Sequence, residues 1–180
     1  MLFEELPIRV AWLLTPEPAR DDRGLFARLW DAEEFERRGL QPAPVQLNTG
    51  WSPRKGTLRG LHWQGPEAPE AKLARVVRGA AFDVIVDLRP GSPTRGRWQG
   101  IELSAENRLA VWVPPLCAHG YPTLTDDTEL QYAASAPFTA SAARGARWDD
   151  PVLEITWPAE VRVISERDRS WPLLELEKAP

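Results

Sequence analysis

The sequence predicts an all-β fold, and three observations indicate this class. Residues 82–88 (FDVIVDL) repeat with a period of two, and Pro90 and Gly91 then end the run as a turn. Several other short apolar runs lie between clusters of turn-forming residues. Few segments of the 180 residues have helical periodicity. Such a pattern is typical of a β-sandwich or a β-barrel.

The clearest strand is expected at 82–88, where alternation separates two faces. One face consists of Phe82, Val84, Val86 and Leu88, and the other of Asp83, Ile85 and Asp87. Further strands are expected at 98–104, 109–114, 128–135 and 153–158, with turns at SAEN, PP, TDD and WDDP.

Two segments predict short helices. The sequence DAEEFERRGL (31–40) offers Asp31 as the N-cap, glutamates in the first turn, arginines in the last turn and Gly39 as the stop. The tail SERDRSWPLLELEKA (165–179) has room for one helical turn. No internal repeat or low-complexity linker is present, so residues 1–180 are expected to form a single domain.

Composition and charge exclude several classes of function. A net charge of −4 provides no excess of positive charge for binding nucleic acid. The apolar runs are far shorter than the roughly 20 residues that span a bilayer. The acidic N-terminus does not resemble a signal peptide. The single cysteine excludes an internal disulfide. We therefore expect a cytoplasmic protein that binds neither nucleic acid nor membranes.

The spacing of reactive residues favours neither a metal centre nor a nucleophilic triad. With a carboxylate, the two histidines His62 and His119 would form a ligand set for non-haem iron. Neither belongs to an H-x-H or H-x-x-x-H pair, so a metal site is disfavoured. We interpret Cys117, close to His119, as a packing residue. Walker-type and dinucleotide-type glycine loops are absent.

Five polar residues stand in strand-like apolar sequence: Arg59 and His62 in LRGLH, Lys72 in AKLARV, His119 in AHGY and Tyr132 in LQYAA. Each has a structural interpretation, because a histidine or tyrosine can pack in a core and an arginine or lysine can be solvated. Taken singly, these residues leave open whether His62 is structural, a metal ligand or a catalytic base.

Taken together, the motifs resemble the dTDP-4-dehydrorhamnose 3,5-epimerase family. The resemblance rests on DDRGLF (21–26), VQLN (45–48), TLRGLHWQ (57–64), residues 71–107, VWVPPLCAHGY (111–121), RGARWDDPVLEITWP (144–158) and ISERD (164–168). It implies a cupin-type jelly roll, a homodimer, and an enzyme that needs no metal and no organic cofactor. It also implies a nucleoside-diphosphate 4-keto-6-deoxyhexose as substrate and a role in deoxysugar biosynthesis, for example of rhamnose for a polysaccharide.

Epimerisation next to a ketone explains the implied catalytic residues. The 4-keto group acidifies the hydrogens on carbons 3 and 5, so inversion needs a base on one face and an acid on the other. The resemblance implies that His62 is the base and that Asp168 fixes its tautomer. It implies that Tyr132 donates the proton on the opposite face and that Lys72 stabilises the charge on the keto oxygen.

The resemblance also implies a set of substrate-binding residues. Arg23 and Arg59 match arginines that contact the diphosphate. Polar pocket residues and an aromatic stacking position for the nucleobase match as well. The full expected set is Arg23, Phe26, Arg28, Gln46, Asn48, Arg59, His119, Phe138 and Arg167.

Three positions depart from the family pattern. Arg28 stands where the family usually has glutamate, Ala143 replaces a polar or acidic residue, and QLNTG (46–50) replaces an acidic, histidine-bearing continuation. The resemblance therefore leaves alternatives open: an epimerase that inverts carbon 3 only, an epimerase for another nucleotide such as CDP, or a non-catalytic sugar-nucleotide binding protein.

Overall fold

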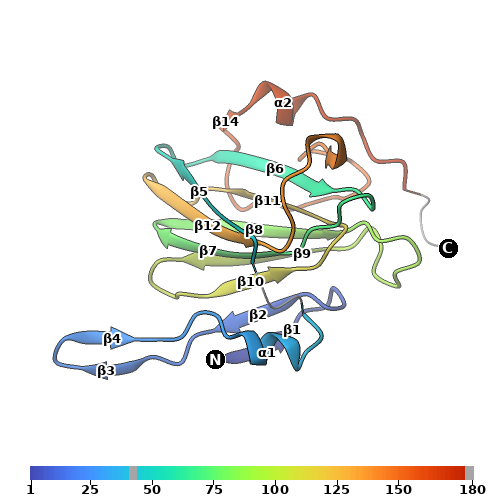
Figure 1. Cartoon of the computed structure of the whole chain (residues 1–180). Coiled ribbons are helices and arrows are strands. Elements are labelled where there is room, and N and C mark those ends of the chain that lie inside the picture. Colours follow the sequence, from blue (N-terminus) through green and yellow to red (C-terminus); the bar gives the residue numbers. More distant parts are fainter. Residues whose placement is uncertain (41–43, 177–180) are drawn as a thin grey trace.

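Two antiparallel sheets packed face to face form the body of the protein (Figure 1). The computed structural model describes residues 1–40 and 44–176. The first sheet has the strand order β1 (Leu2–Glu5), β2 (Trp12–Thr15), β10 (Ala110–Val113), β7 (Lys72–Arg78), β12 (Thr128–Ala134) and β5 (Gln46–Ser52). The second has the order β13 (Ala143–Gly145), β6 (Thr57–Gln64), β11 (Cys117–Pro122), β8 (Ala80–Asp87) and β9 (Trp98–Ser104).

The remaining elements are short. Strand β14 (Val163–Ile164) pairs in parallel with β6, and β3 (Ala19–Asp21) pairs with β4 (Gly24–Phe26) as a separate hairpin. The helices are α1 (Ala32–Glu36), the 3₁₀ turn η1 (Ala140–Ala142) and α2 (Glu166–Arg169). The predicted all-β jelly roll with short helices is confirmed. None of the described helices is long and apolar enough to cross a bilayer.

Strand β8 is buried on both faces, and its predicted alternation is confirmed. Val84 and Val86 pack beneath the segment 146–157 and the C-terminal segment, together with Phe82 and Leu88. Ile85, on the opposite face, joins the core between the two sheets. The aspartates of that face are also buried, which requires polar partners for both.

Helix α1 begins where the sequence predicts it. The side chain of Asp31 accepts a hydrogen bond from the N–H of Glu34, which satisfies one free donor of the first turn. The helix is shorter than predicted. It ends at Glu36, so the two arginines lie after the helix and not in its last turn. The buried ring of Phe35 anchors the helix to the first sheet through Trp112.

One predicted strand is wrong: residues 153–158 form no strand. Asp150 holds the preceding chain in a turn by accepting from the N–H groups of Val152 and Leu174. Glu154 then adopts a positive φ of 50°, which interrupts an extended conformation. The apolar side chains of this segment still pack on the second sheet, so the apolar pattern reflects burial without pairing.

Candidate active site

A cavity of about 670 Å³ opens between the two sheets. Strands β5, β7 and β12 of the first sheet line one side, while β6 and β11 of the second sheet, with α2, line the other. A second cavity of about 330 Å³ adjoins it and extends toward Phe138 and Ala143. Both cavities share Asn48, His62, Lys72, Tyr132 and Arg167, so they form one continuous site.

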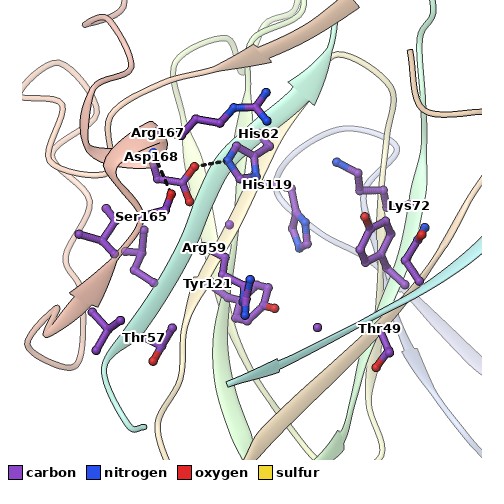
Figure 2. A pocket seen from close by; sticks show the side chains of 17 residues that line it. Thr49, Thr57, Arg59, His62, Lys72, His119, Tyr121, Ser165, Arg167 and Asp168 are labelled. Carbon is purple, nitrogen blue, oxygen red and sulfur yellow. Dashed lines mark hydrogen bonds and ion pairs between the residues drawn. The ribbon is translucent and has the colours of Figure 1, made fainter. Parts of the chain in front are cut away.

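His62 and Asp168 form a hydrogen-bonded pair on the second-sheet side (Figure 2). His62 Nε2 lies 2.6 Å from Asp168 Oδ1. The imidazole is 40% exposed toward the cavity, whereas the carboxylate is 7% exposed. Burial opposes ionisation of Asp168, but the hydrogen bond and charge of His62 outweigh it and hold the pKa of that carboxyl below its ordinary value. The pair therefore combines an accessible imidazole with a buried carboxylate.

Helix α2 fixes the position of Asp168. Ser165 is the N-cap, and its hydroxyl accepts a hydrogen bond from the N–H of Asp168. The second carboxylate oxygen of Asp168 accepts from the N–H of Gly60 at 3.2 Å. The tail helix thus links the carboxylate to the strand that carries His62.

Trp171 packs against the His62–Asp168 pair. Its ring stands edge-on to the imidazole of His62, with 6.4 Å between the centroids. A Cβ at Gly145 would overlap the Trp171 indole, so the glycine of β13 makes room for the ring. Trp171 carried no signal of this role in the sequence, although it follows ISERD closely in the chain.

His119 lies directly opposite His62 on the neighbouring strand, as its register partner. Its Nε2 is 2.7 Å from Oδ2 of the buried Asp83. Gly60 and Gly120 bring β6 and β11 close together here, because a Cβ on Gly60 would overlap the backbone of Gly120. Asp83 lies on the face of β8 that its alternation predicted, but no role was predicted for it.

Lys72 and Tyr132 come from the first sheet and face the cavity from the other side. Lys72 Nζ lies 5.9 Å from the centre of the Tyr132 ring. Burial lowers the pKa of Lys72, and the nearby carboxylates of Glu70 and Asp83 oppose that change. Burial raises the pKa of Tyr132, so its phenol stays protonated over a wide pH range.

The other cavity residues are held by local contacts. The guanidinium of Arg59 donates to Ser52 Oγ and to the Trp51 carbonyl. Gln46 accepts from the N–H of Phe138, whose ring is 60% exposed beside the second cavity. The site thus contains the predicted residues Gln46, Asn48, Arg59, His62, Lys72, His119, Tyr132, Phe138, Arg167 and Asp168.

Three predicted substrate contacts lie outside both cavities. Arg23 and Phe26 belong to the β3–β4 hairpin, which projects from the body of the protein (Figure 1). Phe26 is 75% exposed. Arg28 donates to Asp31 at 2.6 Å instead of facing a cavity. The chain by itself does not bring these three residues to the site.

Two further expectations concern thiol and metal chemistry. Burial raises the pKa of Cys117 to about 12, and its side chain lies in the core between the sheets. This agrees with a packing residue. Across residues 1–40 and 44–176, no group of three or more His, Cys, Asp or Glu side chains is arranged to hold a metal ion.

Comparison with known proteins gives consistent matches over nearly the whole chain. The family model described as dTDP-4-dehydrorhamnose 3,5-epimerase matches residues 5–175. A protein of that name from Sinorhizobium fredii is 43% identical over 175 residues, which cover 97% of this chain and 90% of the relative. A dTDP-4-dehydrorhamnose 3-epimerase of Streptomyces niveus is 37% identical over 175 residues, covering 97% and 84%.

A solved structure is similar as well. The crystal structure of dTDP-4-dehydrorhamnose 3,5-epimerase from Bacillus anthracis, with TDP and PPi bound, matches with a TM-score of 0.92. The identity is 39%, and the match covers 96% of this chain and 99% of that one.

Proposed function

The chain is an enzyme of the dTDP-4-dehydrorhamnose 3,5-epimerase family, and we propose that it inverts two carbons of a nucleotide sugar. The substrate is a nucleoside-diphosphate 4-keto-6-deoxyhexose of the dTDP type, and the inverted centres are carbons 3 and 5. The observation that carries this proposal is the placement of two proton-transferring groups on opposite sheets. His62 reaches the cavity from β6, and Tyr132 reaches it from β12.

The geometry supports a two-step proton transfer. His62 removes the proton from carbon 3 or carbon 5, and the C–H electron pair moves into the ring to give an enolate at the keto oxygen. Asp168 stabilises the resulting imidazolium. The ammonium group of Lys72 stabilises the enolate oxygen. Tyr132 then protonates the same carbon from the opposite face, and solvent restores the proton balance of both residues.

Binding is assigned to the remaining cavity residues. Arg59, His119 and Arg167 supply donors around the larger cavity, where the diphosphate and sugar bind. Asn48 and Gln46 line the route to the second cavity. There the exposed ring of Phe138 offers a stacking surface for a nucleobase. No metal and no organic cofactor takes part in this scheme.

We propose a homodimer, which accounts for Arg23 and Phe26, two of the three residues that lie outside the cavities. Arg23, Phe26 and Arg28 are carried on and just after a hairpin that leaves the body of its own chain. We propose that this hairpin reaches the cavity of a second copy, where Arg23 and Phe26 contact substrate. Exposed apolar side chains support such a contact, among them Leu47 and Trp51 on β5. We further propose a single domain, located in the cytoplasm.

Two alternatives differ in the positions that exchange hydrogen. The first alternative is an enzyme that inverts carbon 3 alone, since one 37% identical relative is named a 3-epimerase, and a non-catalytic binding protein would invert neither. Incubation with a 4-keto-6-deoxy sugar nucleotide in deuterated water separates the three. Deuterium at carbons 3 and 5 supports the proposal, deuterium at carbon 3 alone supports the 3-epimerase, and no deuterium supports the binding protein.

A further inference from the structure

Glu70 is a buried carboxylate inside the site that the proposed reaction does not use. It lies in the loop between β6 and β7 and lines the second cavity. Its side chain is 7% exposed, and its Oε2 lies 3.7 Å from Nζ of Lys72. Within the part of the chain that the structure describes, Lys72 is the cation within ion-pair distance of it. Burying an ionised carboxylate is costly unless a cation compensates it.

A second glutamate of the same loop provides a contrast. The side chain of Glu67 is 43% exposed and pairs with Arg144 at the surface. Glu67 thus has the arrangement expected of a loop carboxylate, whereas Glu70 turns inward toward Lys72. The inward orientation is therefore a specific feature of Glu70, not of the loop.

Few other carboxylates of the described residues lie near Lys72. Burial lowers its pKa, while Glu70 and then Asp83 raise it. Asp83 is hydrogen-bonded to His119. Glu70 is therefore the carboxylate that pairs directly with Lys72, at 3.7 Å. Asp83 lies outside the lining of both cavities but contributes to the charge around Lys72. The titratable and charged groups that line the two cavities with Lys72 are Arg59, His62, Glu70, His119, Tyr121, Tyr132, Arg144, Arg167 and Asp168.

We propose that Glu70 is a positioning residue that holds Lys72 in its ammonium form inside the site. The same negative charge also favours the neutral phenol of Tyr132, whose pKa is raised by burial and then by Glu70. One carboxylate thus keeps two groups protonated, a cation for the enolate and an acid for the final step. The roles of Lys72 and Tyr132 rest on the proposed function, whereas the pairing of Glu70 with Lys72 does not.

The first test is the pH profile of kcat for Glu70→Gln, which keeps the shape of the side chain and removes its charge. A carboxylate at this distance shifts a neighbouring pKa by about one unit or more. We expect the alkaline limb of the profile to move down by about one pH unit. Glu70→Asp, which retains the charge, should restore most of that shift. Glu67→Gln, the matched control, should leave the limb in place.

The second test reads Lys72 without activity. The lysines of the chain are Lys55, Lys72 and Lys178, so ¹³C-lysine labelling gives few signals, and Lys72→Arg assigns one of them. We expect the Lys72 signal to titrate at lower pH in Glu70→Gln than in the unmodified protein. An unchanged Lys72 titration would overturn the inference. A shifted titration with an unmoved activity profile would keep the pairing and would instead contradict the catalytic role of Lys72.

Discussion

At the scale of single residues, the proposed reaction depends on which ring nitrogen of His62 is free. Its Nε2 is occupied by Asp168 at 2.6 Å, so Nδ1 is the nitrogen left for substrate. A proton on Nε2 satisfies the carboxylate and leaves Nδ1 as a lone-pair base. In the proposed mechanism, the buried Asp168 therefore selects the tautomer of His62 that can abstract a proton.

Replacing His62 with asparagine should abolish exchange at both carbons. Asparagine can still donate to Asp168 but has no basic nitrogen. We expect deuterium incorporation to fall by at least the roughly 10²- to 10⁴-fold associated with a positioned acid–base group. Far-UV circular dichroism checks that the variant is folded. Exchange at a near-normal rate would remove His62 from the mechanism.

Because residue 28 is an arginine, the enzyme should discriminate only weakly between nucleobases. Thymine presents an imide N–H, which needs an acceptor, and arginine has donors only. The guanidinium of Arg28 instead pairs with Asp31, the N-cap of α1. We expect dTDP and CDP to bind within about tenfold of each other, or 1.4 kcal/mol.

Calorimetric titration of both nucleotides into the unmodified protein and Arg28→Glu measures this discrimination. The glutamate should increase the preference for dTDP, because it can accept from the imide. A strong dTDP preference in the unmodified protein, unaltered by the substitution, would show that residue 28 never faces the base.

The four residues proposed as catalytic were named from the sequence, whereas the residues that contact and support them were not. His62, Lys72, Tyr132 and Asp168 were assigned by resemblance, and all four surround one cavity. Asp83, Trp171 and Glu70 were not assigned, because their importance depends on tertiary contacts. An aspartate in an alternating strand or a glutamate in a loop has no local signal of its buried partner.

At the scale of elements, strands with strong alternation were predictable and irregular segments were not. Strands β8, β9, β10 and β12 lie where the alternating run 82–88 and the other short apolar runs predicted them. The segment 153–158 has the same apolar alternation, yet it packs as coil on the second sheet. The local sequence pattern indicates which side chains are buried. Whether a segment pairs as a strand depends instead on whether the edge of a sheet is available to it.

The turn from β8 to β9 depends on Asp87. This fully buried carboxylate accepts hydrogen bonds from Arg89, Ser92 and Thr94. Burial alone would raise its pKa, but these donors outweigh burial and lower it to about 2. A carboxyl whose pKa is lowered on folding stabilises the protein above its ordinary pKa of 3.8, and that stability is lost as the pH falls toward 2.

Asp87→Asn should therefore reduce the free energy of unfolding by about 2 kcal/mol at neutral pH. Urea unfolding at pH 7, 4 and 3 should show a smaller loss of stability on acidification in the variant than in the unmodified protein. Asp149→Asn is the control, because this exposed carboxylate pairs with Arg147 at the surface and should change stability little. Equal acid dependence in the Asp87 variant and the unmodified protein would contradict the assignment.

At the scale of the whole molecule, one chain does not assemble every predicted binding residue. The resemblance implied that Arg23 and Phe26 contact substrate, yet the hairpin carries them away from the cavities of their own chain. Sequence matching identifies such residues but does not show whether they contact substrate in their own chain or in a second copy. We propose that these residues reach a cavity only in an assembly of two chains.

Mixing two inactive variants tests that assembly. One variant carries His62→Asn, and the other carries both Arg23→Ala and Phe26→Ala, which remove the proposed contacts of the hairpin. In a mixed dimer, the cavity of the hairpin variant receives the intact hairpin of the His62 variant, so one site regains every residue. Refolding equal amounts together should restore about a quarter of the normal activity, since about half the dimers are mixed and each has one complete site. Each variant refolded alone should stay inactive, and sedimentation should show that both form dimers. If the mixture is no more active than the variants alone, the hairpin does not complete a site in another copy, and Arg23 and Phe26 lose their proposed contact with substrate.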